Sequence, residues 1–238
     1  NRDSDLPESW QKYFLEIESP GILLEVVLHL GTLLSILLYY RYDIYDLLQG
    51  IYRKDADSLY YVSMVGVATV PTIAIGLFFK AQLESLFSPI FVPYMLLITG
   101  CVLLITKYSS ETTKSITLKI SILIGCAQVL AIIPGISWSG ITIVMALFYQ
   151  IKREDAAEFS FLMVLFPILG ITLVELFFIL NTQVSIDVIT IKGLAIAFLA
   201  SFVSGLIACY YMIKIVENNS LKYFGFYCLI IALIGIIL

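Results

Sequence analysis

Long apolar stretches separated by short polar segments dominate the pattern along the chain. Four of them carry no charged residue, at positions 58–79, 85–106, 120–151 and 193–213, and three shorter ones are nearly as apolar, at 26–40, 159–174 and 223–238. A helix needs about 20 apolar residues to cross the hydrocarbon core of a bilayer. Most of these stretches therefore predict one transmembrane helix each.

The stretch at 120–151 does not fit a single crossing. It is too long for one helix, it is interrupted by Pro134-Gly135, and it is too short for two full crossings and a turn. A hairpin of two half-helices that enters and leaves the membrane by the same face satisfies these limits, provided that its non-helical tip is buried in protein or lines a wet cavity. The pattern predicts such a re-entrant hairpin.

The distribution of Lys and Arg favours this topology, since basic residues accumulate on the cytoplasmic side. With a re-entrant hairpin, one side carries ten basic residues and the other four; with a simple crossing the split is seven to seven. The ten are Arg41, Arg53, Lys54, Lys107, Lys114, Lys119, Lys152, Arg153, Lys214 and Lys222, and the four are Arg2, Lys12, Lys80 and Lys192.

The fold class predicted from these patterns is an all-α polytopic membrane protein with six transmembrane helices and at least one re-entrant hairpin. We expect residues 1–238 to form a single integral membrane domain, with a polar extracytoplasmic lead-in at 1–20 and the hairpin at 120–151. Both ends of the chain are expected outside the cytoplasm.

Composition supports the membrane assignment and excludes other classes. Of the 238 residues 60% are hydrophobic and 13% are charged, whereas soluble domains are nearer half apolar and a quarter charged. The net charge of −4 without a basic block argues against a nucleic-acid partner. The cysteines lie inside apolar stretches without metal-ligand spacing, so we interpret Cys101, Cys126, Cys209 and Cys228 as packing residues.

A weak internal repeat is also present. Residues 29–34 can be laid over 168–173, and residues 75–77 over 204–206. The predicted topology makes the two copies inverted relative to each other, as in many transporters. In such folds the first copy also begins with a hairpin, so we expect an upstream hairpin that is missing from the sequence, before Asn1.

The segment from Pro134 to Thr142, PGISWSGIT, is the candidate for chemistry. Its proline and two glycines break the helix, and three hydroxyl side chains lie beside the start of the second half-helix. A helix N-terminus offers unpaired N–H groups and partial positive charge, which suit a phosphate. The alternative is that Ser and Thr only cap a half-helix inside the membrane.

Residues 128–143, QVLAIIPGISWSGITI, resemble the second signature of the undecaprenyl-diphosphate phosphatase family, usually Pro-Gly-x-Ser-Arg-Ser-Gly-x-Thr. The resemblance extends in order through EVVLHLGT at 25–32 with Arg41 after it, VPTIAIGLFF at 70–79, LFSP at 86–89 and AAEFSFL at 156–162. It is collinear over nearly the whole chain.

The resemblance implies a multi-pass enzyme of the bacterial plasma membrane, associated with bacitracin resistance. Such an enzyme hydrolyses a C55 polyprenyl diphosphate to the carrier lipid phosphate of cell-wall synthesis. It also implies a divalent cation, Mg²⁺ or Ca²⁺, although the visible chain offers no metal ligands. A homodimer is a further expectation.

The site residues that the resemblance implies lie in the same segment. Ser137 and Ser139 are expected to be catalytic, by binding phosphate oxygens or supplying a hydroxyl. The residues expected to contact substrate are Gln128, Gly135, Trp138, Gly140 and Thr142. In-line attack of water or a hydroxyl on the terminal phosphorus would follow.

Two departures from the family pattern predict weak or no activity in this form. The first signature, a glutamate-rich helix followed by Ser-Ser/Thr-Gly-His, has no counterpart; His29 belongs to a later span. Trp138 stands where the family has arginine, and indole offers one N–H and no charge in place of a bidentate cation. The alternative function is a non-hydrolytic polyprenyl-phosphate binding protein or lipid transporter.

Other ionisable residues receive structural interpretations. We expect a contact between Glu25 and His29, one turn apart in the first span. Glu175 is interpreted as a local hydrogen-bonding or interfacial residue. Asp155 and Glu158 are interpreted as a solvated helix start, where acids favour the helix dipole.

Overall fold

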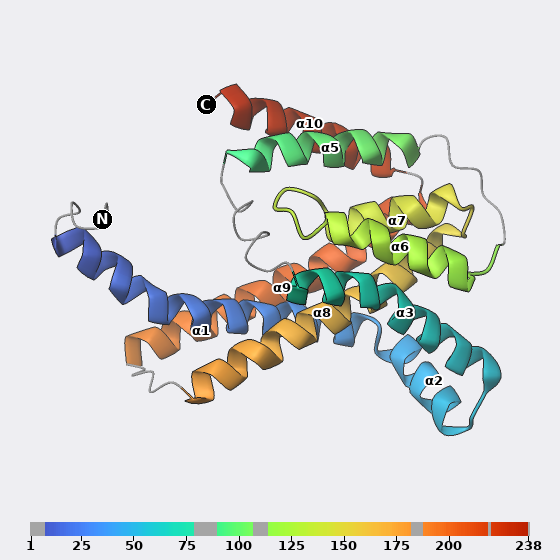
Figure 1. Cartoon of the computed structure of the whole chain (residues 1–238), viewed down its shortest axis with the longest axis horizontal. Coiled ribbons are helices and arrows are strands. Elements are labelled where there is room, and N and C mark those ends of the chain that lie inside the picture. Colours follow the sequence, from blue (N-terminus) through green and yellow to red (C-terminus); the bar gives the residue numbers. More distant parts are fainter. Residues whose placement is uncertain (1–7, 79–89, 107–113, 182–187, 219, 238) are drawn as a thin grey trace. The chain divides into compact units, whose positions relative to one another are not determined.

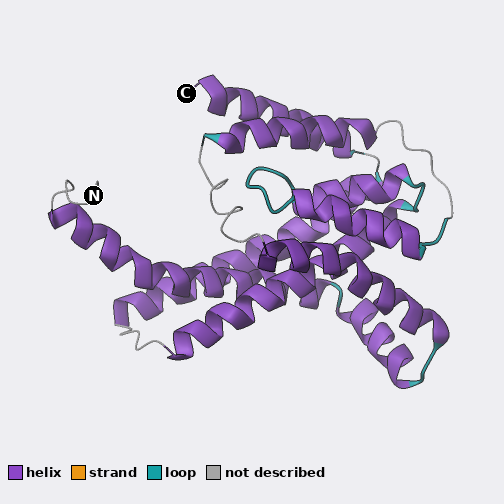
Figure 2. Ribbon diagram, viewed as in Figure 1, coloured by secondary structure: helices purple, strands orange, loops and turns teal. Residues whose placement is uncertain are grey.

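A computed structural model describes residues 8–78, 90–106, 114–181, 188–218 and 220–237 of the chain, and these are almost entirely helical (Figures 1 and 2). The helices are α1 (Glu8–Tyr39), α2 (Arg41–Tyr52), α3 (Ala56–Phe78), α5 (Phe91–Ile105), α6 (Leu118–Leu130), α7 (Trp138–Phe148), α8 (Arg153–Asn181), α9 (Val188–Glu217) and α10 (Leu221–Ile237). The described parts of the predicted apolar stretches are largely helical, and the stretch at 120–151 is divided between α6 and α7 by a loop. The all-α prediction is confirmed.

Three helices in the described part of the chain are long and apolar enough to cross a membrane. They contribute Ala56–Gly76 of α3, Arg153–Val174 of α8 and Ile191–Glu217 of α9. A fourth crossing is possible if α1 and α2 form one span, although Leu23–Tyr39 and Arg41–Tyr52 are bent by 75°. The count of six crossings stays a prediction.

Large apolar side chains point outward along these helices. Phe177 on α8 is 71% exposed, Ile196 on α9 is 68% exposed, and Ile230 on α10 is 58% exposed. Soluble proteins rarely expose contiguous apolar surface of this kind, whereas lipid tails cover it without cost. The protein is therefore a polytopic membrane protein.

The chain divides into two compact units. The first comprises Asn1–Tyr40 and Ile168–Cys209. In it α1 and α9 approach closely, because a Cβ on Gly31 would lie 2.8 Å from the Cβ of Ser201. The Ser201 hydroxyl donates to the Leu28 carbonyl at 2.8 Å and lies 3.1 Å from the Thr32 hydroxyl. Small residues and interhelical hydroxyls are the usual means of helix packing in membranes.

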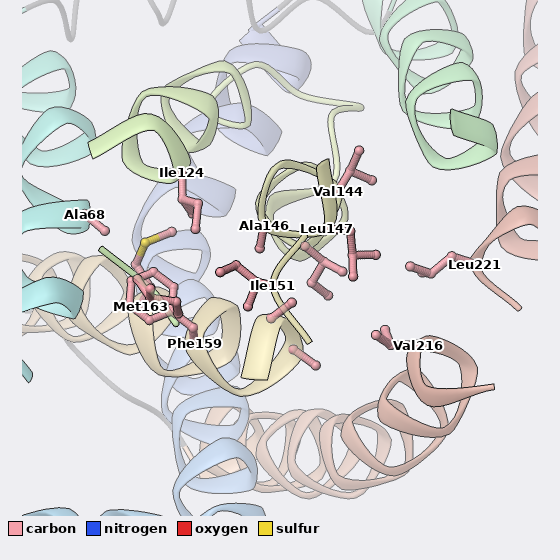
Figure 3. Close-up of a cluster of buried hydrophobic side chains, with 14 of the residues drawn as sticks. Ala68, Ile124, Val144, Ala146, Leu147, Ile151, Phe159, Met163, Val216 and Leu221 are labelled. Carbon is pink, nitrogen blue, oxygen red and sulfur yellow. The ribbon is translucent and has the colours of Figure 1, made fainter. Parts of the chain in front are cut away.

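The second unit comprises Arg41–Pro167 and Tyr210–Leu238. Its core is a cluster of buried apolar side chains from several helices, including Ala68 of α3, Ile124 of α6, Ala146 of α7 and Phe159 and Met163 of α8 (Figure 3). This core fixes α7 against its neighbours and so places the start of α7.

Two helix pairs form the frame around α7. In the pair of α3 and α6, the Ser121 hydroxyl donates to the Met64 carbonyl at 2.5 Å and Gly125 lies against the Ala68 backbone, so the two helices run parallel. In the pair of α5 and α10, a Cβ on Gly100 would lie 2.7 Å from Leu229 and one on Gly235 would lie 3.1 Å from Pro93. The second pair is therefore antiparallel.

Candidate active site in the loop between α6 and α7

The helical path breaks where the sequence predicts it. α6 ends at Leu130, α7 begins at Trp138, and residues 131–137 form a loop between them (Figure 2). At about 1.5 Å per residue, helices of 13 and 11 residues are about 20 Å and 16 Å long, short of a core about 30 Å thick. Neither half of this hairpin crosses a membrane alone.

The two ends of the hairpin lie side by side. Lys114, before α6, pairs with Ile151, after α7, in an isolated parallel bridge. The hairpin therefore leaves the core of its unit at the place where it entered. This geometry agrees with the re-entrant topology, which itself stays a prediction.

Ser137 caps the start of α7. It has extended backbone dihedrals, φ −75° and ψ 120°, and its hydroxyl oxygen accepts a hydrogen bond from the Gly140 N–H at 3.1 Å. The bond satisfies one of the N–H groups that a helix start leaves open. Because the oxygen acts as the acceptor, the Ser137 O–H remains able to donate to another group.

Both glycines of the motif are required by close contacts. Gly135 has φ +98°, and a Cβ there would lie 2.5 Å from the Val92 carbonyl oxygen. A Cβ on Gly140 would lie 2.8 Å from the Ser137 hydroxyl oxygen and disturb the cap. The glycines therefore let the loop approach α5 and let the cap form.

Thr99 of α5 holds the loop from outside. Its hydroxyl donates to the Gly135 carbonyl at 2.8 Å and accepts from the Ser137 N–H at 3.2 Å. Thr99 is not among the site residues predicted from the sequence. Its only signal is a hydroxyl in an otherwise apolar stretch, and such a residue usually bonds to its own helix.

The start of α7 presents donors for an anion. The Gly140 N–H donates to the Ser137 hydroxyl, and the Ile141 N–H donates to the Ser137 carbonyl. Within the described residues, the N–H groups of Trp138 and Ser139 have no acceptor. The side chains of Trp138 and Ser139 are half-buried. Two adjacent N–H groups and nearby hydroxyls suit a phosphate oxygen.

Thr142 faces its own helix. Its hydroxyl donates to the carbonyls of Trp138 and Ser139, at 2.9 and 3.1 Å, and its side chain is fully buried. The structure therefore gives Thr142 hydrogen bonds that support the first turn of α7.

Gln128 lies near the end of α6 with its side chain fully buried. Among the residues that the structure describes, neither its amide oxygen nor its amide nitrogen has a hydrogen-bond partner. The register of α3 and α6, set by Ser121 against Met64, places Thr72 near the level of Gln128. The Thr72 hydroxyl is likewise buried, without a partner in the described ranges. Orphaned amides and hydroxyls are rare and costly, so their retention needs a reason.

The charged residues singled out from the sequence lie elsewhere. Glu158 of α8 is partly buried and accepts a hydrogen bond from the Tyr61 hydroxyl at 3.3 Å, while Asp155 is exposed. On α1, Glu25 is exposed and His29 is half-buried. The side chain of Glu175 lies outside the described residues. In the described ranges no three His, Cys, Asp or Glu side chains gather closely enough to hold a metal ion.

Long apolar helices with exposed apolar side chains define the class as a polytopic α-helical membrane protein, and its candidate site is the start of α7. A family model described as "Bacitracin resistance protein BacA" matches residues 10–234. The chain belongs to this family.

Several named relatives are similar over most of the chain. A protein of Christiangramia forsetii named "Undecaprenyl-diphosphatase" is 33% identical over 238 residues, which is 99% of this chain and 85% of the relative. Proteins of the same name from Parabacteroides distasonis and Methanococcus maripaludis strain C7 are 35% and 34% identical, over 89% and 84% of this chain and 81% and 79% of the relatives.

Proposed function

We propose that the chain hydrolyses undecaprenyl diphosphate to undecaprenyl phosphate and inorganic phosphate in the plasma membrane. The observation that carries the proposal is the start of α7, where the Trp138 and Ser139 N–H groups and the Ser137 hydroxyl are available inside an apolar bundle. The names of the relatives agree with this substrate.

The terminal phosphate is the group that this helix start would bind. Its oxygens would accept from the Trp138 and Ser139 N–H groups and from the hydroxyls of Ser137 and Ser139, so charge developing in the transition state meets fixed dipoles. Gly135 and Gly140 let the backbone approach. Water would attack the terminal phosphorus and lose a proton to solvent, the bond to the bridging oxygen would break, and the lipid monophosphate and inorganic phosphate would leave. If the Ser139 hydroxyl attacks instead, the lipid monophosphate leaves first, and water then hydrolyses the phosphoserine to inorganic phosphate and regenerates the hydroxyl.

Gln128 fits a second role at the same end of the hairpin. A buried primary amide without a partner has two donors and one acceptor to offer. We assign it to the substrate, as the sequence resemblance implies, and Thr142 to support of the loop. A ligand that engages the amide would remove the cost of burying it unpaired.

A divalent cation does not fit the described side chains. The loop offers neutral hydroxyl and amide oxygens, and within the described ranges no cluster of acidic, histidine or cysteine side chains accompanies them. If Mg²⁺ or Ca²⁺ takes part, it would accompany the substrate, whose diphosphate is the anion that binds it. A homodimer also remains a proposal.

Trp138 weakens the proposed site. An arginine at this place would add a charged, bidentate donor next to the helix start, and the loss of such a contact costs roughly 2–4 kcal/mol of transition-state stabilisation. That loss corresponds to about 30- to 1,000-fold in rate. We therefore expect slow hydrolysis by this chain, and a binding protein that carries the lipid without cleaving it is the alternative.

The direct test is an assay of purified full-length protein with C55 polyprenyl diphosphate in detergent micelles. We expect release of inorganic phosphate and formation of the lipid monophosphate, measured by phosphate analysis and mass spectrometry. Saturable lipid binding with no monophosphate formed would favour the carrier over the enzyme.

A pair of variants at Ser137 separates catalysis from capping. Ser137→Asp keeps an acceptor for the Gly140 N–H and so keeps the cap, but its charge repels phosphate, whereas Ser137→Ala loses a cap worth about 1 kcal/mol. We expect Ser137→Asp to melt like wild type and to lose at least about tenfold in phosphate release. If Ser137→Asp has wild-type activity, Ser137 only caps α7 and does not bind the phosphate.

A further inference from the structure

We infer that Thr99 is the positioning residue of the proposed site: its hydroxyl holds the turn from Gly135 to Ser137 so that the first N–H groups of α7 face the phosphate. The inference rests on the proposed function, because the turn leads directly into the helix start that would bind the diphosphate.

The Thr99 hydroxyl bonds to both ends of the turn. It donates to the Gly135 carbonyl at 2.8 Å and accepts from the Ser137 N–H at 3.2 Å, and the side chain is 4% exposed. Both backbone groups lie outside the helices, where no helical hydrogen bond pairs them, and backbone groups in a protein interior are almost always paired. One hydroxyl therefore satisfies two groups that would otherwise be unpaired.

The other hydrogen bonds of the loop are local. The N–H groups of Ala131, Ile132 and Ile133 donate to carbonyls in the last turn of α6, and the Ile136 N–H donates to the Ile133 carbonyl. These bonds shape the loop but do not fix its position against α5. Among the described residues, Thr99 supplies the side-chain hydrogen bonds that do so.

The contact surface on α5 extends over two helical turns. A Cβ on Gly135 would lie 2.5 Å from the Val92 carbonyl oxygen and 2.8 Å from the Met95 Cβ. Val92, Met95 and Thr99 recur at the spacing of one helix face. Packing against α10 at Gly100 and Gly225 holds α5 in turn, since a Cβ on Gly225 would lie 3.0 Å from the Gly100 carbonyl oxygen.

The consequence for chemistry passes through Ser137. The Ser137 N–H donates to the Thr99 hydroxyl, and the Ser137 hydroxyl oxygen accepts from the Gly140 N–H, so the Thr99 bond fixes the backbone of the residue that caps α7. Without this hydrogen bond, we expect the N–H groups of Trp138 and Ser139 to point in other directions. Misplacement of about 1 Å by a remote change can cost about a hundredfold in rate.

The test compares Thr99→Val, which keeps shape and loses the hydroxyl, with Thr99→Ser, which keeps it. The control is Thr69→Val, because Thr69 is also buried but its hydroxyl donates to the Val65 carbonyl of its own helix at 2.9 Å. The chain has two tryptophans, Trp10 and Trp138. All variants carry Trp10→Phe, so that Trp138 is the one that remains. Trp138 then reports on the loop by its emission and anisotropy.

For Thr99→Val we expect a lower anisotropy of Trp138 and a kcat about 10- to 100-fold below wild type, with KM within about threefold. Thr99→Ser and Thr69→Val should remain within about threefold of wild type in kcat and should keep the wild-type anisotropy. The activity is phosphate release from C55 polyprenyl diphosphate, and circular dichroism verifies the helical content.

If Thr99→Val shows the same Trp138 anisotropy and the same kcat as Thr69→Val, the inference is overturned, even if the enzyme is active. A change of anisotropy in Thr99→Val alone, with no phosphate release by any variant or by wild type, would support the positioning role and refute the proposed hydrolysis. Should Thr99→Val lose helical content, Thr99→Cys replaces it, since a thiol is a weak donor. Agreement of Thr99→Cys with Thr99→Ser in both readouts would overturn the inference.

Discussion

Gly135 adopts a backbone conformation that other residues rarely take, with φ +98°, and its Cα faces the backbone of α5. Any side chain here both strains the turn and collides with the Val92 carbonyl oxygen. The sequence predicts a break at Pro134-Gly135, but the reason for the glycine is a contact with a helix about 40 residues earlier, which no local pattern reveals.

Gly135→Ala should therefore lower the free energy of unfolding by roughly 2–3 kcal/mol, as strained backbone conformations usually cost 1–3 kcal/mol each. Gly66→Ala is the matched control, because Gly66 lies inside α3 and a Cβ there has no neighbour within 4 Å. Alanine at a helical glycine stabilises by up to about 1 kcal/mol. Thermal unfolding in detergent measures both; equal melting temperatures would contradict the role of the turn.

The candidate site residues were predictable in part. The motif at 134–142 predicts the broken helix and the hydroxyls at the start of α7, and the structure brings Ser137, Ser139 and Gly140 together there. The contacts of Thr99 and the back-bonding of Thr142 were not predictable, because both depend on which helix face meets the loop. Hydroxyls in apolar helices look alike in sequence.

The helices themselves follow closely from apolar runs, since each run needs a helix to satisfy its backbone in a membrane. The differences lie at the ends. α1 begins at Glu8, inside the segment predicted as a polar lead-in, and α5 begins at Phe91, later than the run at 85–106 indicates. The first part of that run lies outside the described residues.

The hairpin of α6 and α7 gives a prediction about sidedness. The bridge between Lys114 and Ile151 and the ten-to-four distribution of basic residues both favour a topology with Lys114 and Lys152 on one face of the membrane. Cysteines at these two positions, in a background without the four native cysteines, should respond alike to a membrane-impermeant maleimide on intact cells. Lys192→Cys should give the opposite response, because the same distribution places it on the other side.

Labelling of Lys114→Cys but not Lys152→Cys on intact cells, with both labelled after permeabilisation, would exclude the re-entrant hairpin. It would also move the start of α8 to the other side of the membrane and change the direction of α8 and every helix after it.

Over the full chain, composition and charge predict the class, and the resemblance at 128–143 predicts the family that the match over residues 10–234 establishes. Activity does not follow in the same way, because it depends on a few charges at one site. Trp138 is the departure from the family pattern that lies at the start of α7. Indole leaves the N–H groups of α7 in place but removes the cation that would stand beside them.

The measurement that tests this account most directly is phosphate release from C55 polyprenyl diphosphate by the full-length protein with Trp138 and with Trp138→Arg. We predict a rate at least about tenfold higher for arginine, because a guanidinium stabilises phosphoryl charge, while Trp138→Phe, which only loses the indole N–H, should show no increase. Equal rates for Trp138 and Trp138→Arg, in proteins of equal helical content, would contradict the claim that the start of α7 binds the reacting phosphate.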